Sequence, residues 1–349
     1  MSERSWAVLT DGYTTVRNAK TAHGVLRYAR DPVVAVLDRE HGGKTMDVVM
    51  PELGSTAPIV ASLGDARALG ATALLLGVAT PGGWVPDHWR EWMLEAVDAG
   101  MEVANGLHRF LTEDDDLVAR AARSGARLWD VRRVPEDIPL FTGKSLEVPQ
   151  KIVATVGTDC AVGKMTASLE LVDAGQQTGT RCEFIATGQT GILIAGGGIA
   201  VDRVISDFLS GAAEMLVCGA DPSAEVLVVE GQGGLWHPAY AGVTLGLLHG
   251  SAPHVLVLCH QAYRTAIEEP PFTRLPPLVD MVRVYEEAAA TVRPARVACV
   301  SVNCRGLSDD DARRALGAIE DELGIPAGDV FRGGSGKLWD AVAAGLAHT

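Results

Sequence analysis

The chain has 349 residues, 47% of them hydrophobic and 21% charged, and its net charge is −14 at pH 7. This length exceeds that of one typical domain and the composition is globular, so two domains are expected. The negative charge argues against a nucleic-acid partner or an anionic membrane. No apolar run is long enough to span a bilayer, and the N-terminus lacks the features of a signal peptide, so we expect a cytoplasmic protein without membrane contact.

Residues 1–134 alternate between strand-like and helix-like segments. Buried parallel strands are predicted at 6–10, 33–37 and 73–77, further strands at 102–105 and 127–131, and helices at 87–99 and 114–124. The acidic run at 114–116 fits a helix start, where the helix dipole favours negative charge, better than it fits a metal site. The first domain is therefore predicted to be an open α/β sheet.

A linker is predicted at 135–150, because three prolines interrupt this segment and no periodic pattern runs through it. Residues 151–349 then form a second α/β domain, with a parallel sheet covered by helices on both faces. Its strands are predicted at 151–156, 182–187, 226–229, 255–258 and 296–302, and its helices at 167–177, 200–209, 277–290, 308–323 and 336–347.

The segment 157–166 carries the clearest chemical signal in the chain. It lies between a predicted strand and a predicted helix, and it consists of Gly157, Thr158, Asp159, Cys160, Ala161, Val162, Gly163, Lys164, Met165 and Thr166. Backbone N–H groups of such a turn, the helix start and the lysine charge all favour an anion. We therefore predict that these ten residues hold the phosphates of a nucleotide or of a nucleotide-bearing cofactor, and favour this over a coincidental glycine turn.

Met165 departs from the usual phosphate-loop pattern, which has Ser or Thr directly after the lysine to bind Mg²⁺. A thioether is a poor ligand for a hard cation. Thr166 does not replace it, because consecutive helical residues point about 100° apart. The loop is thus better suited to phosphate alone than to Mg-ATP.

Polar residues follow the other predicted strands, at the sheet edge where ligands gather in parallel sheets. Gln189 and Thr190 bring side-chain donors to a glycine-rich turn and are predicted to bind substrate, the alternative being a surface loop. Glu230 is a candidate general base or water-mediated Mg²⁺ ligand, or else an exposed turn carboxylate. His260 is a second candidate base, and Arg264 is predicted either to clamp a substrate carboxylate or to form a surface ion pair.

The cysteines and histidines do not indicate a metal site. The six cysteines contain no Cys-x-x-Cys pair and the histidines no His-x-x-x-His pair, so reduced thiols and no bound metal are expected. Cys160 lies inside the phosphate loop, where a lowered pKa would permit a nucleophilic role. We favour a small residue that fills the loop.

Several motifs together resemble known proteins. The stretches 157–159, 162–164 and 229–234 resemble dethiobiotin synthetase. The longer stretches 157–166, 186–191, 198–202, 229–233 and 237–240, with 21–28 in the first part, resemble the DUF1611 family over nearly the whole chain. This resemblance implies a Rossmann-like N-terminal domain followed by a dethiobiotin-synthetase-like P-loop domain. Gly234 departs from the small hydroxyl residue expected there.

One branch of that family is similar to D-glutamate N-acetyltransferases, which use acetyl-CoA and act beside an enolase-type racemase of N-acetylglutamate. The resemblance therefore implies acetyl transfer from acetyl-CoA to a D-amino acid, with D-glutamate as the expected small-molecule substrate. A homo-oligomer is also expected. Coenzyme A offers a pyrophosphate to the loop and needs no metal ligand at position 165. The alternatives are an ATP- and Mg-dependent kinase or ligase like dethiobiotin synthetase, and a non-catalytic nucleotide-binding protein.

Overall fold

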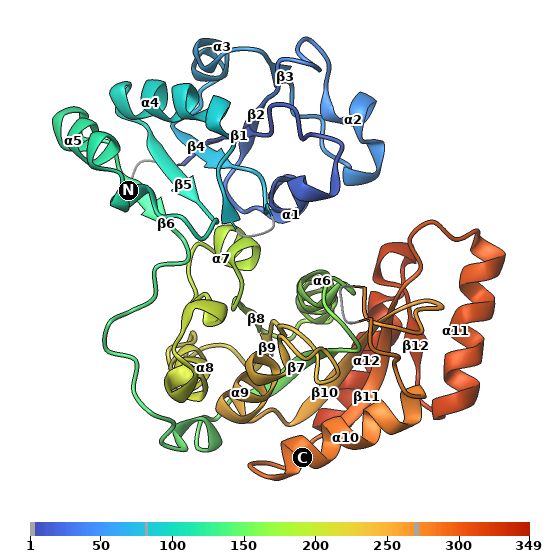
Figure 1. Cartoon of the computed structure of the whole chain (residues 1–349). Helices are drawn as coiled ribbons and strands as arrows, with labels where there is room; N and C mark the ends of the chain where they lie inside the picture. The colour runs from blue at the N-terminus through green and yellow to red at the C-terminus, as the bar shows by residue number, and fades with distance from the viewer. Residues whose placement is uncertain (1–3, 81–82, 269–271) are drawn as a thin grey trace. The chain divides into compact units, whose positions relative to one another are not determined.

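The computed structural model describes residues 4–80, 83–268 and 272–349. The chain forms two compact units, one made of Met1–Arg133 with Gln189–Ala200 and the other of Val134–Gly188 with Val201–Thr349 (Figure 1). Within the described residues each unit contains one six-stranded sheet, and all the strand pairs are parallel. Two parallel sheets with helices confirm the predicted α/β fold class. In this part of the chain no helix has both the length and the apolar character needed to cross a membrane.

The sheet of the first unit has the order β3-β2-β1-β4-β5-β6. Its strands are β1 (Trp6–Leu9), β2 (Val33–Leu37), β3 (Ile59–Val60), β4 (Ala73–Leu76), β5 (Glu102–Asn105) and β6 (Leu128–Asp130). β1 and β4 are buried along their whole length, as their continuous apolar sequences predict. β3 was not predicted, because its two residues are too few to show a strand pattern.

The helices of the first unit are α1 (Lys20–Tyr28), α2 (Met46–Val49), α3 (Leu63–Ala68), α4 (Arg90–Asp98), α5 (Asp115–Ser124) and α7 (Gln189–Ala195). Side chains of α3, α4 and α5 share one core with the sheet, including Trp92 and Leu117. The acidic run starts α5 as predicted, because the carboxylate of Asp114 accepts hydrogen bonds from the backbone N–H groups of Asp116 and Leu117.

The second unit has the sheet order β12-β11-β10-β7-β9-β8. Its strands are β7 (Lys151–Gly157), β8 (Cys182–Ile185), β9 (Val226–Val229), β10 (Val255–Gln261), β11 (Arg296–Asn303) and β12 (Ala327–Gly328). β7 pairs with β9 on one side and β10 on the other, and β9 also pairs with β8. The carboxyl ends of these four strands therefore meet at one edge, where ligands gather in parallel sheets.

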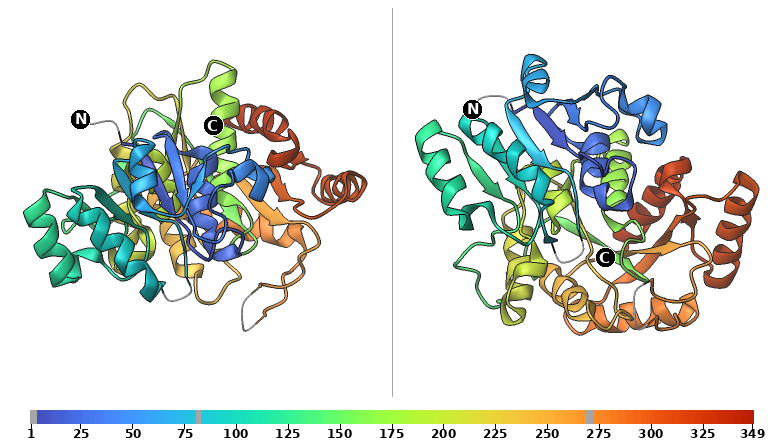
Figure 2. Two further views of the ribbon diagram at one scale, coloured as in Figure 1. Left: turned by 90° about the horizontal axis from the view of Figure 1, so that it is seen from above. Right: turned by 45° about the horizontal axis from the view of Figure 1, so that its top comes forward.

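The helices of the second unit are α6 (Lys164–Gln177), α8 (Leu209–Cys218), α9 (Ala241–Ser251), α10 (Leu278–Ala290), α11 (Asp309–Leu323) and α12 (Ser335–Leu346). α8 and α9 lie side by side (Figures 1 and 2), and their residues share a core with α10, α11 and β7. α6 packs with α12. The predicted linker at 135–150 packs on this unit, since Glu214 of α8 accepts hydrogen bonds from the N–H and hydroxyl of Thr142.

The predicted helix at 200–209 is wrong. Residues Val201–Arg203 and Ser206–Phe208 form short 3₁₀ turns, separated by extended backbone at Ile205, and α8 begins only at Leu209. The apolar residues that bury a helical face, such as Ala213 and Val217, belong to this later helix. The predicted helix was placed too early because no residue type in this stretch signals the extended backbone at Ile205.

Residues 189–200 leave the second unit and return to it. The backbone N–H of Val201 donates to the carbonyl of Thr187, so the two ends of this segment lie next to each other in the second unit. The intervening helix α7 packs with α1 in the first unit, where the hydroxyls of Thr21 and Thr190 lie 3.3 Å apart. The expected second domain, 151–349, was continuous and included these residues, whereas in the structure they group with the first unit.

Candidate functional site

The predicted phosphate loop is a tight turn between β7 and α6. Two of its residues have positive φ, Ala161 at 53° and Gly163 at 105°, and Gly163 is the N-cap of α6. Glycine suits Gly163 because side chains with a Cβ rarely adopt this conformation. The strand, the turn and the helix thus follow one another as the sequence predicted, and the loop ends at the helix start that would face an anion.

Lys164 is the first residue of α6 and its side chain is buried, with 7% of its surface exposed. Its Nζ donates a hydrogen bond to the carbonyl oxygen of Asp159, 2.8 Å away, inside the same loop. Burial lowers the pKa of Lys164, and this is only partly offset by Cys160, Cys259, Asp159 and Glu230. An anion bound at the loop would supply the missing counter-charge.

Asp159 holds the loop against the segment after β10. Its buried carboxylate accepts hydrogen bonds from Arg264 Nη1 at 2.6 Å, the backbone N–H of Glu268 at 2.9 Å and the backbone N–H of Cys160 at 2.6 Å. Arg264 also pairs with the carboxylate of Glu268 and the side chain of Gln261. The guanidinium predicted to clamp a substrate carboxylate is therefore engaged in supporting the loop.

Thr158 and Tyr285 fix the start of the loop. The hydroxyl of Thr158 lies 3.0 Å from Nδ1 of His260. His260 was expected to follow a strand, but β10 continues to Gln261, so His260 lies within the strand near its carboxyl end. Burial, followed by the charge of Arg264, lowers the pKa of His260 to about 4, so the imidazole is neutral at neutral pH. The Tyr285 hydroxyl donates to the carbonyl of Gly157 at 2.7 Å.

Glu230 lies directly after β9 and is buried, with 4% of its surface exposed. Its Oε2 accepts hydrogen bonds from the backbone N–H groups of Thr187, at 3.0 Å, and Gly188, at 3.1 Å. Burial raises the pKa of Glu230 to about 7, although these hydrogen bonds and the charge of Lys164 act in the opposite direction. The alternative of an exposed turn carboxylate is wrong, and the carboxyl group is poised to exchange a proton near neutral pH.

Gln189 and Thr190, predicted to bind substrate, lie at the start of α7 in the first unit. The amide oxygen of Gln189 accepts a hydrogen bond from Arg132 Nη2 at 2.8 Å, and Thr190 is buried against Thr21. Both side chains therefore contribute to packing of that unit. Met165 and Thr166, in contrast, lie on the first turn of α6 and are partly buried.

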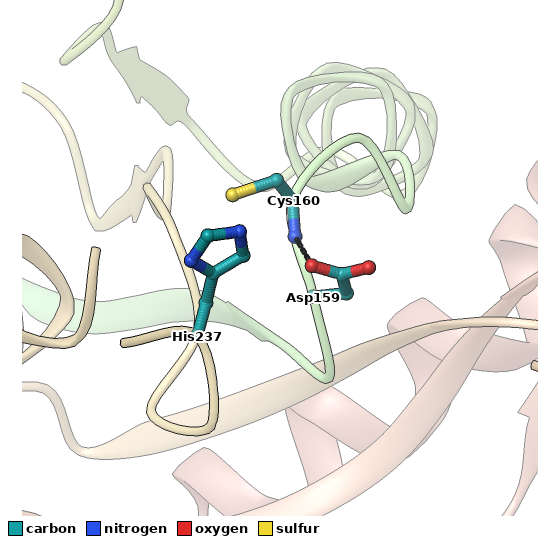
Figure 3. A group of neighbouring side chains, drawn as sticks. All are labelled: Asp159, Cys160 and His237. Carbon is teal, nitrogen blue, oxygen red and sulfur yellow. Dashed lines mark hydrogen bonds between the residues drawn. The ribbon is translucent and has the colours of Figure 1, made fainter. Parts of the chain in front are cut away.

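The structure also brings to the loop a residue that was not among the predicted site residues. His237, from the turn after β9, is buried with 2% exposure beside Asp159 and Cys160 (Figure 3). Their nearest ring-nitrogen, carboxylate and sulfur atoms all lie within 4.8 Å of one another. The only sequence signal was the stretch 237–240, one of those that resemble a known family. Cys160 is partly exposed, and all six cysteines are free thiols.

Comparisons with known proteins agree with this architecture. The Rossmann-like N-terminal domain of DUF1611, a domain of unknown function, matches residues 39–134, and the DUF1611 P-loop domain matches residues 139–339. Two relatives are named D-glutamate N-acetyltransferase. The protein from Tritonibacter scottomollicae is 38% identical over 284 residues, covering 81% of this chain and 84% of that protein. The protein from a Pseudoalteromonas species is 40% identical over 277 residues, covering 78% and 82%.

A solved structure is similar over almost the whole chain. The crystal structure of a DUF1611 family protein from Anabaena variabilis ATCC 29413 matches with a TM-score of 0.92 and 37% sequence identity, covering 98% of this chain and 99% of that one. The resemblance seen in the sequence motifs is thereby confirmed, and this chain belongs to the DUF1611 family.

Proposed function

We propose that the protein is an acetyl-CoA-dependent N-acetyltransferase whose acceptor is a D-amino acid, with D-glutamate as the first candidate. The relatives named D-glutamate N-acetyltransferase support the reaction class, because they match about four fifths of this chain. The observation that supports acetyl-CoA as the acetyl donor is the composition of the phosphate loop. It combines a buried lysine at a helix start with a methionine where a Mg²⁺-binding hydroxyl usually stands.

The loop 157–166 would hold the phosphates of coenzyme A. Lys164 would exchange its hydrogen bond to the Asp159 carbonyl for a phosphate oxygen, and the N–H groups at the start of α6 would donate to the same group. Arg264 would act indirectly, since it keeps Asp159 and hence the loop in place. No step of this binding requires a metal ion.

Of the two candidate bases, Glu230 is the better matched. The attacking amine must lose a proton, and a base works best when its pKa lies near the working pH. Glu230 has a pKa of about 7, whereas that of His260 is about 4. In this role Glu230 would accept the proton of the attacking amine, directly or through one water.

An ATP-dependent kinase or ligase is the second candidate, and the position of Glu230 favours it. Phosphate-loop enzymes place a metal-binding carboxylate at the end of a strand beside the loop. Two features oppose it: Met165 offers no hard oxygen ligand, and the carboxylate of Asp159 is already engaged with Arg264.

The deciding experiment is a matched pair of assays on the purified protein. Acetyl transfer from acetyl-CoA is measured with D-glutamate, L-glutamate and other amino acids, each with EDTA and with Mg²⁺, and ATP turnover is measured in parallel. The proposal expects transfer to D-glutamate that EDTA leaves unchanged. Mg-dependent ATP turnover without transfer to any amino acid would reject it in favour of the second candidate.

A further inference from the structure

His237 carries a buried polar atom that has no partner. The residue is 2% exposed, and among residues 4–80, 83–268 and 272–349 nothing forms a hydrogen bond with its Nε2. This nitrogen lies on the side of the ring that faces the phosphate loop, toward Cys160 and Asp159 (Figure 3). A buried polar group without a partner costs about 1–3 kcal/mol, so its presence calls for an explanation.

The other ring nitrogen determines what Nε2 can do. Nδ1 of His237 accepts a hydrogen bond from the backbone N–H of Ala239, with 3.3 Å between the nitrogens. A neutral imidazole has one donor and one acceptor nitrogen. Because Nδ1 is the acceptor, Nε2 carries the hydrogen, and the unpartnered atom at the loop is a donor.

This assignment excludes two other uses of the cluster formed by Asp159, Cys160 and His237. A metal ion would need a bare Nε2, and it would also compete with the N–H groups and the guanidinium that already bind Asp159. A base for the Cys160 thiol would likewise need a lone pair at Nε2. A donor instead needs an acceptor, such as an oxygen of a bound anion.

The turn that carries His237 is fixed to the loop at two points. A Cβ at Gly234 would lie 2.9 Å from the carbonyl oxygen of Gly157, so glycine allows the two backbones to touch. The Tyr285 hydroxyl donates to that carbonyl and accepts from the backbone N–H of Leu235 at 3.2 Å. The imidazole is therefore held in place before any ligand binds, which lowers the cost of binding.

We propose that His237 is a further anion-binding residue of the phosphate loop: its Nε2–H donates a hydrogen bond to a phosphate oxygen of the ligand that Lys164 also contacts. The ligand class is a nucleotide or nucleotide-bearing cofactor with a diphosphate group. The inference depends on an anion at the loop, as in the proposed function, but not on acetyl transfer.

The test compares His237→Leu, which removes the donor, with His237→Gln, whose amide nitrogen can replace Nε2–H. The probes are acetyl-CoA, ATP and inorganic pyrophosphate, measured by calorimetry, and His348→Leu at the exposed C-terminal end is the control. Loss of a hydrogen bond to a charged group should weaken binding of at least one probe by roughly 10- to 100-fold in His237→Leu. We expect His237→Gln and the control to stay within about threefold of the wild type.

A second measurement covers the case in which His237→Leu does not fold. Nitrogen-15 NMR of labelled histidines in the wild type should show hydrogen on Nε2 of His237 and a shift of that signal when pyrophosphate is added. Hydrogen on Nδ1, stoichiometric zinc held through His237, or unchanged affinity for all three probes in His237→Leu would each overturn the inference.

The outcomes separate this inference from the proposed function. Probe binding that depends on His237, without acetyl transfer to any amino acid, would support the anion site and reject the transferase. Acetyl transfer with an unchanged KM for acetyl-CoA in His237→Leu would support the transferase and reject the role of His237 in anion binding. A wild-type protein that binds none of the probes would overturn both.

Discussion

The buried carboxyl group of Glu230 should make the stability of the protein depend on pH. In the fold its pKa is raised from an ordinary value of 4.5 to about 7, so the folded protein keeps this proton when the unfolded chain has lost it. Between these two pH values the folded state binds more protons, and the stability that this group contributes therefore falls as the pH rises. Replacing Glu230 with glutamine should remove this loss.

The magnitude follows from the size of the shift. Each pKa unit corresponds to about 1.4 kcal/mol, and the difference in bound protons between the folded and unfolded states, integrated from pH 5 to pH 8, amounts to roughly two pH units. Glu230→Gln should thus gain about 2–3 kcal/mol relative to the wild type as the pH rises over this range. Glutamine keeps an oxygen for the N–H groups of Thr187 and Gly188, which both bind Oε2, so the substitution changes mainly the charge.

The assay is urea unfolding of the wild type and Glu230→Gln at pH 5, 6, 7 and 8 with a reducing agent. Glu322→Gln, which removes an exposed carboxylate from α11, controls for the change in net charge. The difference in unfolding free energy between Glu230→Gln and the wild type should grow with pH, most steeply between pH 5 and 7. A difference that does not vary with pH would refute the raised pKa, and with it the case for Glu230 as a base near neutral pH.

Three further substitutions test the loop. Lys164→Ala should weaken binding of acetyl-CoA by roughly 10- to 100-fold without unfolding the protein, because it removes a charge-assisted contact. If calorimetry finds that this variant binds both acetyl-CoA and ATP as tightly as the wild type does, the phosphate-loop assignment is rejected. Met165→Ser should leave acetyl transfer unchanged with or without EDTA, and a gain in Mg-dependent ATP binding would favour the kinase or ligase. Gly234→Ala should cost about 1–3 kcal/mol in thermal unfolding, since its Cβ would press on the Gly157 carbonyl at 2.9 Å; a melting temperature equal to that of the wild type would show that the turn can move away.

The sequence by itself determined the fold class and the phosphate loop. Apolar runs such as 151–156 and 255–258 specify strands buried on both faces, and these signals are local. The loop is equally local, because Gly163 and Lys164 take their roles from the strand before them and the helix after them. Glu230 was also predictable, since a residue directly after a buried parallel strand lies at the ligand edge of the sheet.

Only the tertiary structure decided what the side chains around the loop do. Arg264 and Asp159 are 105 residues apart, and their pairing ties the residue predicted as a substrate clamp to the phosphate loop. Gln189 and Thr190 follow a strand of the second unit, yet α7 packs with α1 in the first. His237 reaches the loop because Gly234 allows close backbone contact and Tyr285 joins the two turns. Such contacts depend on chain segments far apart in sequence, whereas hydrophobic periodicity and turn residues report only on near neighbours.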